Sequence, residues 1–213
     1  MNLHRLAVKP AYDRGVLDVA DLSPDPFQQF RAWFEAAAAS GIRAPEAMAL
    51  ATATPAGVPS ARMVLLRGFD ERGFGFYTSY ESRKGCELAK NPRAALLFHW
   101  DSLGRQVRIE GPVERLTPEE SDDYFHSRPR GRQLGAAASL QSRQLESRAE
   151  LERRYAELEA AHPDGDVPRP EFWGGFRLKP ESFEFWQHGE NRLHDRFRYA
   201  RRGNEWRIEL LYP

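Results

Sequence analysis

A succession of short strand-like segments separated by turn signals is the strongest constraint that this sequence places on its fold. The segments read AMALATAT, PSARMVLLRGF, GFGFYTS, RAALLFHW and RQVRIEGPVERL, between residues 47 and 116. Their apolar, β-branched and aromatic content is typical of strands. Turn-forming residues stand between them at 55–57, 70–73 and 102–104. Strands joined by such short connections predict an antiparallel meander, which can close into a barrel.

Two helices are predicted before and within this meander. Residues 23–41 have Ser23 or Asp25 as the cap, a proline suited to the first turn, and Gly41 as the stop signal. Aromatic residues recur in this segment at helical spacing, which indicates a face packed on the core. Residues 82–91 form a short helix that interrupts the meander after its third strand.

Two further helices follow the meander. Thr117 and Glu120 form a capping-box pattern at the start of the first one. The second, residues 145–162, has one apolar side that carries Leu145, Leu151, Tyr155 and Leu158. Strands are then predicted at 174–187, 191–199 and 204–213.

The chain shows neither internal repeats nor a linker long enough to separate two domains. Residues 1–22 have no strong periodicity and are predicted to form an N-terminal arm or lid. Residues 23–213 are predicted to form one domain that is mainly β, a barrel with peripheral α-helices.

Composition excludes several classes of function. The chain has 213 residues, with 31 basic and 31 acidic side chains, and this balance argues against a nucleic-acid-binding protein. No apolar run approaches the roughly 20 residues of a membrane span, and the N-terminus lacks a secretory signal. A cytoplasmic protein is therefore predicted. The single cysteine, Cys86, excludes an internal disulfide, and no metal-ligand spacing is present.

Nucleotide-binding and catalytic motifs are also absent. The sequence contains neither a G-x-G-x-x-G nor a G-x-x-x-x-G-K-[ST] motif, and no G-x-S-x-G. An enzyme with this sequence is therefore expected to take its reactivity from an organic cofactor.

Four stretches concentrate groups that suit anions. In the first, Arg62 and Arg67 stand on either side of an apolar strand. The second, SRKG at 82–85, starts a helix whose free N–H groups favour an anion. The third, YFHSRPRGRQLG at 124–135, is interpreted as a basic Pro/Gly loop. In the fourth, NRLHDRFRY at 191–199, an extended strand would turn Arg192, His194, Arg196 and Arg198 to one face. Solvated charges are the alternative for each stretch. Two separate basic clusters that suit a phosphate, in a protein of zero formal net charge, suggest two phosphorylated ligands.

The segments RMVLLRG, FYTSYESRKG, YFHSRPRGRQLGAAASLQS, FEFWQ and RLHDRFRY together resemble the pyridoxamine 5′-phosphate oxidase family. The matches run in order from about residue 12 to the C-terminus. The resemblance implies a split β-barrel, a homodimer, and flavin mononucleotide (FMN) bound in two clefts at the subunit interface.

Site residues also follow from the resemblance. FMN is expected to contact Arg62, Met63, Val64, Leu65, Leu66, Arg67, Tyr77, Thr78, Arg83, Lys84 and Gln106, with Arg83 and Lys84 at its phosphate. The partner subunit is expected to complete that site with Gln141, Ser142, Trp186 and Arg196. The expected substrate-binding residues are Tyr12, Arg67, Tyr124, Arg128, Arg132, Arg192, Leu193 and His194.

Among the substrate-binding residues, Tyr124 and Arg128 match those that hold the substrate phosphate, and Tyr12 matches a lid residue. Arg192 and His194 match the catalytic pair that orients the pyridine ring over the flavin, and Arg198 is expected to face solvent.

The implied reaction oxidises pyridoxamine or pyridoxine 5′-phosphate to pyridoxal 5′-phosphate, with O₂ as acceptor and H₂O₂ as product. Four positions depart from the usual family pattern: Arg67, Arg132, His188 and Leu210. The alternatives are a flavin oxidase of the phenazine-biosynthesis type, which tends to lose the substrate-phosphate residues retained here, and a non-catalytic flavin or pyridoxal-phosphate carrier. The sequence does not rank the amine against the alcohol substrate.

Overall fold

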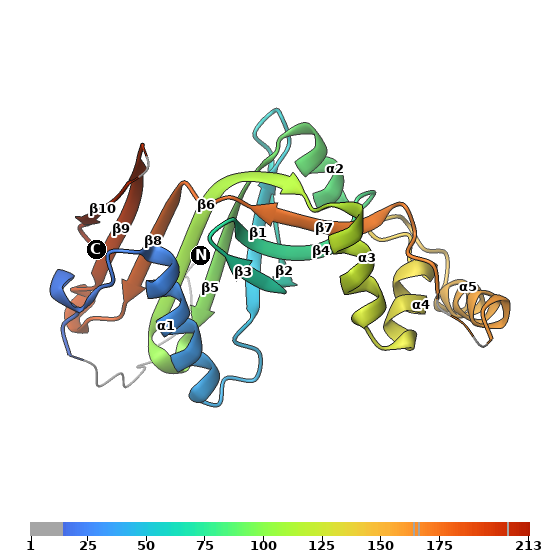
Figure 1. Cartoon of the computed structure of the whole chain (residues 1–213), viewed down its shortest axis with the longest axis horizontal. Coiled ribbons are helices and arrows are strands. Elements are labelled where there is room, and N and C mark those ends of the chain that lie inside the picture. The colour runs from blue at the N-terminus through green and yellow to red at the C-terminus, as the bar shows by residue number, and fades with distance from the viewer. Residues whose placement is uncertain (1–14, 164, 166, 204) are drawn as a thin grey trace, which may run out of the picture. The chain divides into compact units, whose positions relative to one another are not determined.

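The computed structural model of the chain describes residues 15–213 except 164, 166 and 204. Tyr12 and most of the predicted arm lie outside the described residues. The helices, with the 3₁₀ turns written η, are η1 (Val19–Asp21), α1 (Pro26–Ala39), α2 (Arg83–Lys90), η2 (Asp101–Leu103), α3 (Pro118–Ser127), α4 (Arg130–Ala138), α5 (Arg148–Ala161) and η3 (Glu190–Arg192). The strands are β1 (Ala47–Ala53), β2 (Pro59–Leu65), β3 (Gly68–Asp70), β4 (Gly73–Ser79), β5 (Arg93–Trp100), β6 (Arg105–Arg115), β7 (Trp173–Leu178), β8 (Ser182–Gln187), β9 (Asp195–Arg202) and β10 (Glu205–Leu210) (Figure 1).

The chain divides into two structural units. The first contains residues up to 45, 99–107 and 184–213, and the second contains residues 46–98 and 108–183. Strands β5, β6 and β8 each contribute residues to both units. The prediction of one domain over residues 23–213 stays a prediction.

The predicted meander is only partly present in the second unit, because β5 returns to lie beside β1 and β4 pairs with β3 and β7 instead of standing between β2 and β5. Strand β1 pairs antiparallel with β2 and with β5, and the strand order there is β6-β5-β1-β2. Strand β4 pairs antiparallel with β3 and β7, and β7 pairs with β6. Phenylalanine rings fill the space between strands: Phe76 and Phe176 stack with centroids 5.7 Å apart, and Phe74 meets Phe183 at 5.8 Å.

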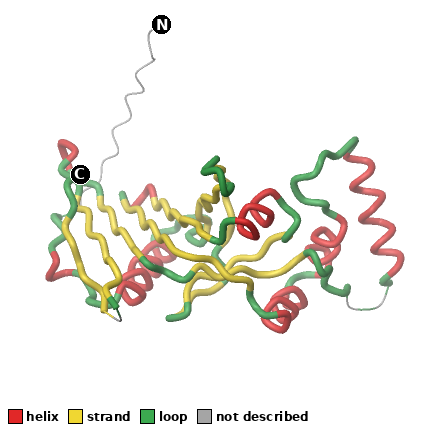
Figure 2. The backbone as a smooth tube through the Cα atoms, turned by 90° about the horizontal axis from the view of Figure 1, so that it is seen from above, coloured by secondary structure: helices red, strands yellow, loops and turns green. Residues whose placement is uncertain are grey.

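Helices α3, α4 and α5 lie together in the second unit, as Figures 1 and 2 both show. The buried side chains that join them to the strands are Phe125, Leu134, Val167 and Trp173, and Tyr155 and Leu158 of α5 pack against this cluster. Helix α5 begins at Arg148 with Ser147 as its cap. Leu145 therefore precedes the helix and is exposed, which corrects its predicted place on the apolar side.

The predicted basic loop at 128–132 is wrong. Arg128 caps the end of α3, and α4 begins two residues later at Arg130. Pro129, with φ −52°, precedes the first turn of α4, so that its ring starts a helix rather than continuing a loop.

In the first unit, helix α1 packs on aromatic side chains of the strands. Asp25 accepts a hydrogen bond from Phe27 N and caps the helix, as one of the two predicted residues. Trp33 meets Phe185 edge-on at 5.2 Å, and Phe30 lies 6.1 Å from Trp100. The strand order in this unit is β10-β9-β8-β6.

None of the described helices combines the length and apolar character needed to cross a membrane.

The capping box of α3 supplies a test of local stability. Thr117 Oγ1 accepts a hydrogen bond from Glu120 N at 3.1 Å, and Thr117 N donates to Glu120 Oε2 at 3.0 Å. Because Thr117→Ala leaves a helix N–H without its acceptor, we expect the free energy of unfolding to fall by about 1 kcal/mol. Urea denaturation measures this loss. The exposed Ser102→Ala is the control, and an equal effect of both substitutions would contradict the role of the cap.

Candidate active site

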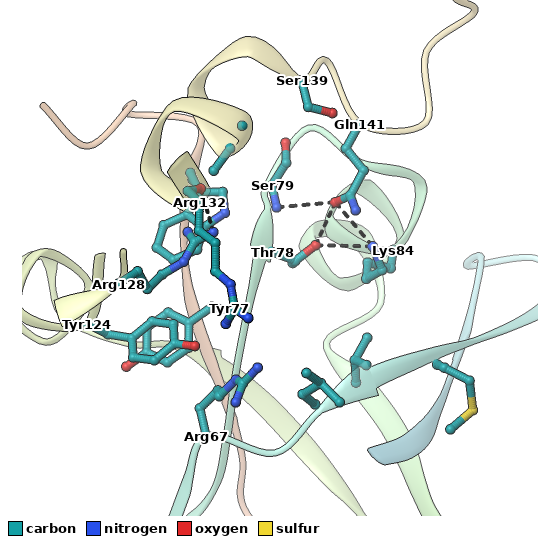
Figure 3. Close-up of a pocket in the computed structure, with 16 residues that line it drawn as sticks. Arg67, Tyr77, Thr78, Ser79, Lys84, Tyr124, Arg128, Arg132, Ser139 and Gln141 are labelled. Atoms are coloured by element: carbon teal, nitrogen blue, oxygen red, sulfur yellow. Dashed lines mark hydrogen bonds between the residues drawn. The ribbon is translucent and has the colours of Figure 1, made fainter. Parts of the chain in front are cut away.

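A cavity of about 530 Å³ in the second unit brings together most of the predicted ligand-binding residues of that unit. Its volume falls in the range of small-molecule sites. The predicted residues that line it are Met63, Val64, Leu65, Arg67, Tyr77, Thr78, Lys84, Tyr124, Arg128, Arg132 and Gln141. Figure 3 shows the labelled side chains converging on this space from β4, α2, the segment after β2, α3, α4 and the segment after α4.

Lys84 forms one end of the cavity. Its Nζ donates to Thr78 Oγ1 at 3.1 Å and to Gln141 Oε1 at 3.3 Å (Figure 3). Burial lowers the pKa of Lys84 to about 8, and the positive charge of Arg62 acts in the same direction. No carboxylate pairs with Lys84 in the part of the chain that the structure describes. A buried ammonium with only neutral partners suits an anionic ligand.

The local sequence explains why Lys84 reaches this place. Ser82 caps α2: its hydroxyl accepts from Gly85 N at 3.3 Å and donates to Ser79 O at 2.7 Å. A Cβ on Gly85 would lie 2.3 Å from Tyr80 O, so only glycine allows the first turn of α2 to approach the end of β4 this closely. The helix start predicted at SRKG is thus confirmed.

Arg62 and Arg83 do not line the cavity. Both guanidinium groups bind the buried carboxylate of Glu87, with Arg83 Nε 2.9 Å from Oε1 and Arg62 Nη2 3.4 Å from Oε2. The hydroxyls of Thr52 and Ser60 donate to the same Oε2 at 2.5 and 2.6 Å. Although burial alone would raise it, these hydrogen bonds and ion pairs lower the pKa of Glu87 to about 2.

Arginine and aromatic side chains form the other end of the cavity. Tyr77 and Tyr124 stack with ring centroids 3.9 Å apart, and Tyr77 lies 5.6 Å from Trp173. The Arg128 guanidinium lies 4.8 Å from the Trp173 ring, and its Nη2 donates to Arg132 O at 2.7 Å. Arg128 Nη1 is buried without a hydrogen-bond partner.

Positive charge therefore accumulates at this end. Burial lowers the pKa of Arg128, and the charges of Arg132 and Arg67 lower it further. Figure 3 shows the Arg67 and Arg132 side chains directed toward the same space beside the two tyrosines. Among the described residues no carboxylate pairs with Arg67, Arg128 or Arg132. The donors fit a phosphate, and the rings beside them fit a planar ligand.

Five further residues line the cavity without having been predicted from the sequence: Ser79, Gly135, Ala136, Ser139 and Trp173. Trp173 stands in the sequence just before a glycine-rich strand, which is the only signal that marks it. Gln141 reaches Lys84 within the same chain. Three other predicted residues stay outside the lining: Leu66 is buried, Ser142 is exposed with φ +73°, and Gln106 lies in the first unit.

The first unit also holds the predicted residues Trp186, Arg192, Leu193, His194 and Arg196. The strand predicted at 191–199 is wrong in its first half, because β9 begins at Asp195 and residues 190–192 form the turn η3. Asn191 and Arg192 have φ values of +53° and +66°, a left-handed backbone that breaks a strand. Arg192, Leu193 and His194 therefore precede the strand, and Arg192 and Leu193 are exposed.

Arg196 and Arg198 do lie on β9, and each binds a carboxylate. Arg196 contacts the buried Glu184 through Nε at 2.9 Å, and its Nη1 donates to Tyr212 O at 2.8 Å. Arg198 pairs with Glu209 at 2.5 Å on the exposed face, as expected for a solvent-facing charge.

Trp186 lies beside His194, with ring centroids 4.6 Å apart. Burial lowers the pKa of His194, and the neighbouring charges of His188 and Arg192 add to the effect. Trp186, Arg192 and Arg196 thus lie near His194 in the first unit.

The mainly β architecture, together with the solved structures that it matches, places the protein in the class of split β-barrel proteins. A solved pyridoxamine 5′-phosphate oxidase-related, FMN-binding protein from Nostoc punctiforme matches with a TM-score of 0.72 over 90% of this chain and 100% of that chain, at 18% identity, which concerns the fold alone. A family model described as pyridoxamine 5′-phosphate oxidase matches residues 34–162, and one described as the pyridoxine 5′-phosphate oxidase C-terminal dimerisation region matches residues 173–213. The chain belongs to the pyridoxamine 5′-phosphate oxidase family.

Relatives of known name agree with this membership. The chain is 59% identical over 202 residues to a pyridoxine/pyridoxamine 5′-phosphate oxidase of Rubrobacter xylanophilus, covering 95% of this chain and 93% of that protein. It is 53% identical over 209 residues to the protein of the same name from Salinibacter ruber, covering 97% of each. The solved PhzG of Burkholderia lata, in complex with tetrahydrophenazine-1-carboxylic acid, matches with a TM-score of 0.89 at 35% identity, over 96% of this chain and 100% of that chain.

Glu87 gives the site a measurable acid sensitivity. The pKa of Glu87 falls from an ordinary 4.5 to about 2 on folding. Its contribution to the free energy of unfolding is therefore complete above pH 4.5 and is lost as the pH falls through about 2. This contribution is about 3 kcal/mol at most. We expect Glu87→Gln to lose less unfolding free energy than the wild type across that interval, measured by urea denaturation at a series of pH values. The exposed Glu159→Gln on α5 is the control, and identical pH profiles for wild type and Glu87→Gln would contradict the buried ion pairs.

Proposed function

We propose that this protein is an FMN-dependent oxidase that converts pyridoxamine 5′-phosphate and pyridoxine 5′-phosphate to pyridoxal 5′-phosphate. The observation that carries the proposal is a cavity with a buried lysine at one end and, at the other, three arginines that no described carboxylate pairs with. The chain that holds it is 51–59% identical to several oxidases of that name. Two separate cationic ends suit a phosphorylated cofactor and a phosphorylated substrate.

The residues at the lysine end would hold the cofactor. Lys84 and Thr78 offer donors to the FMN phosphate, and Gln141 lies within reach of both. The apolar wall of Met63, Val64 and Leu65 would lie against the flavin ring. When bound, FMN supplies a two-electron acceptor that O₂ reoxidises.

The arginine end would hold the substrate phosphate. Arg128 Nη1 has an unsatisfied donor, and Arg132 and Arg67 bring further guanidinium groups toward the same space. Guanidinium binds phosphate with two parallel hydrogen bonds, so three such groups orient as well as attract the substrate. The protein's part in the reaction is this orientation together with the exclusion of water.

The overall reaction balances without a protein nucleophile. The C4′ alcohol of pyridoxine 5′-phosphate loses two electrons and two hydrogens, and O₂ takes them up as H₂O₂. The amine route also consumes one water and releases ammonia. Arg192 and His194, at the turn before β9, would contact the substrate and orient its ring.

We further propose a homodimer in which Trp186 and Arg196 of one subunit complete the site of the other. The match of residues 173–213 to a dimerisation region supports this arrangement. Tyr12 stays the proposed lid residue, and a cytoplasmic location stays a prediction.

Incubation of the FMN-loaded protein with pyridoxine 5′-phosphate under air tests the proposed function. We expect equimolar aldehyde and peroxide, followed by absorbance and a peroxidase-coupled assay. Pyridoxamine 5′-phosphate should give the same aldehyde together with ammonia. Flavin reduction by another substrate class would favour the phenazine-type alternative, since PhzG shares the fold. FMN binding without any turnover would indicate a carrier.

Lys84→Met tests the cofactor end of the cavity. A charge-assisted hydrogen bond is worth roughly 1.5–3 kcal/mol, so we expect the FMN dissociation constant to rise at least about tenfold. In the wild type the affinity should also fall as the pH rises above about 8, because Lys84 then loses its proton. Flavin fluorescence quenching measures both effects.

The matched control is Lys90→Met, which removes an exposed lysine from the last turn of the same helix. Its FMN affinity and pH dependence should equal those of the wild type. If Lys84→Met also binds FMN as tightly as the wild type, the phosphate does not lie at Lys84.

A further inference from the structure

The hydrogen bond that holds His194 defines which of its ring nitrogens carries the proton. Gly189 N lies 3.1 Å from His194 Nδ1. A backbone N–H can only donate, so Nδ1 must accept and cannot itself bear hydrogen. The remaining proton of the neutral imidazole is then on Nε2.

The surrounding backbone holds this contact in place. His188 N donates to Gly104 O at 2.8 Å, Leu193 N to Glu190 O at 2.9 Å, and His194 N to Arg192 O at 2.9 Å. The chain reverses between Gly189 and His194 through the left-handed residues Asn191 and Arg192. Such backbone is costly for residues other than glycine, and it persists where the surrounding structure enforces it.

Glycine is the one residue type that fits at position 189, where the backbone approaches the Leu193 carbonyl most closely. A Cβ there would lie 1.8 Å from Leu193 O and 2.6 Å from the Leu193 carbonyl carbon. Both are backbone atoms that cannot move away without opening the turn. The φ of Gly189 is −121°, so it is the close approach, not the backbone conformation, that requires glycine.

We propose that Gly189 is a positioning residue that keeps His194 a neutral imidazole with its proton on Nε2, so that His194 presents a hydrogen-bond donor to the substrate and does not act as a base. This inference rests on the proposed function only for the identity of the substrate. The protonation state itself follows from the contacts of the turn.

The charges around His194 favour the same state. Burial lowers its pKa, and His188, Arg192 and Arg196 lower it further, while Asp195 opposes them. Protonation of Nδ1 would also place two N–H groups against each other across the Gly189 contact. The neutral form therefore dominates at neutral pH.

This assignment constrains the chemistry at the substrate. The proton released from the C4′ alcohol or amine cannot be taken by Nδ1, which is occupied, or by Nε2, which already carries hydrogen. Nε2 instead donates to an acceptor oxygen of the bound substrate. His194 thereby contributes orientation rather than proton abstraction.

Long-range ¹H–¹⁵N spectra of protein labelled on histidine give the direct test. The two ring nitrogens of a neutral imidazole have well-separated shifts, so the pattern of cross-peaks identifies the tautomer. We expect the Nε2–H pattern for His194 at neutral pH, with the resonance assigned by its loss in His194→Gln. An Nδ1–H pattern or a charged imidazolium at neutral pH would overturn the proposal.

His126 is an internal control, because its contacts require the proton on Nδ1 instead of Nε2. Its Nδ1 lies 2.9 Å from Asp122 O, and a carbonyl oxygen can only accept, so Nδ1 of His126 must carry hydrogen. The two histidines should therefore differ in the same spectrum. In Gly189→Ala, an intact His126 signal shows that the protein is folded, and the His194 signal should lose its Nε2–H pattern or become a mixture.

Kinetics of two variants separate a donor from a base. The amide nitrogen of glutamine replaces Nε2–H, whereas that of asparagine lies nearer the place of Nδ1. We expect the kcat/KM of His194→Gln to be about tenfold higher than that of His194→Asn. This ratio corresponds to one hydrogen bond to a charged or polar acceptor. Equal losses in both variants would contradict donation from Nε2. Absence of turnover in the wild type would refute the proposed function while the spectra still decide the tautomer.

Discussion

Pairing between buried carboxylates and arginines determines which cations of this neutral protein remain for a ligand. Glu87 holds Arg62 and Arg83, and Glu184 holds Arg196. Each of these carboxylates is buried, where an ion pair is screened less than at the surface. In the cavity, by contrast, Lys84 and the three arginines have no carboxylate partner among the described residues. Positive charge without a carboxylate partner is thus concentrated in the cavity, where it can bind an anion.

Close approach of the backbone is the second condition for the site. Gly85 lets the first turn of α2 meet the end of β4, which aims Lys84 into the cavity. Gly189 lets the turn before β9 close on His194 and fixes one of its ring nitrogens. In both places a methyl group would collide with a carbonyl oxygen. Close approach of the backbone at these two glycines therefore sets where Lys84 and His194 lie.

Local signals in the sequence predicted much of this structure. The capping box at Thr117 and the helix start at SRKG rest on contacts between residues near one another in the chain, and both are present. The β1–β2 hairpin is present too, but the long-range pairings of β1 with β5 and of β4 with β7 replace the expected simple meander. Two local predictions failed, one at Pro129 and one at Asn191 and Arg192. Pro129 starts α4 inside the expected basic loop, and the left-handed Asn191 and Arg192 replace the first half of an expected strand.

The sequence by itself determined the kind of elements, the neutral charge balance and the family resemblance, because composition, spacing and capping are properties of the chain alone. Long-range packing settles which arginines of the described chain lack a carboxylate partner. Arg62 looks as suitable for a phosphate as Arg128 does in the sequence, yet Glu87, 25 positions along the chain, binds it. The same carboxylate binds Arg83 from four positions away on one helix, a local pairing that the i,i+4 spacing itself indicates. Charge is local to a residue, but its availability depends on which distant side chain lies beside it, and that is fixed only when the strands and helices pack.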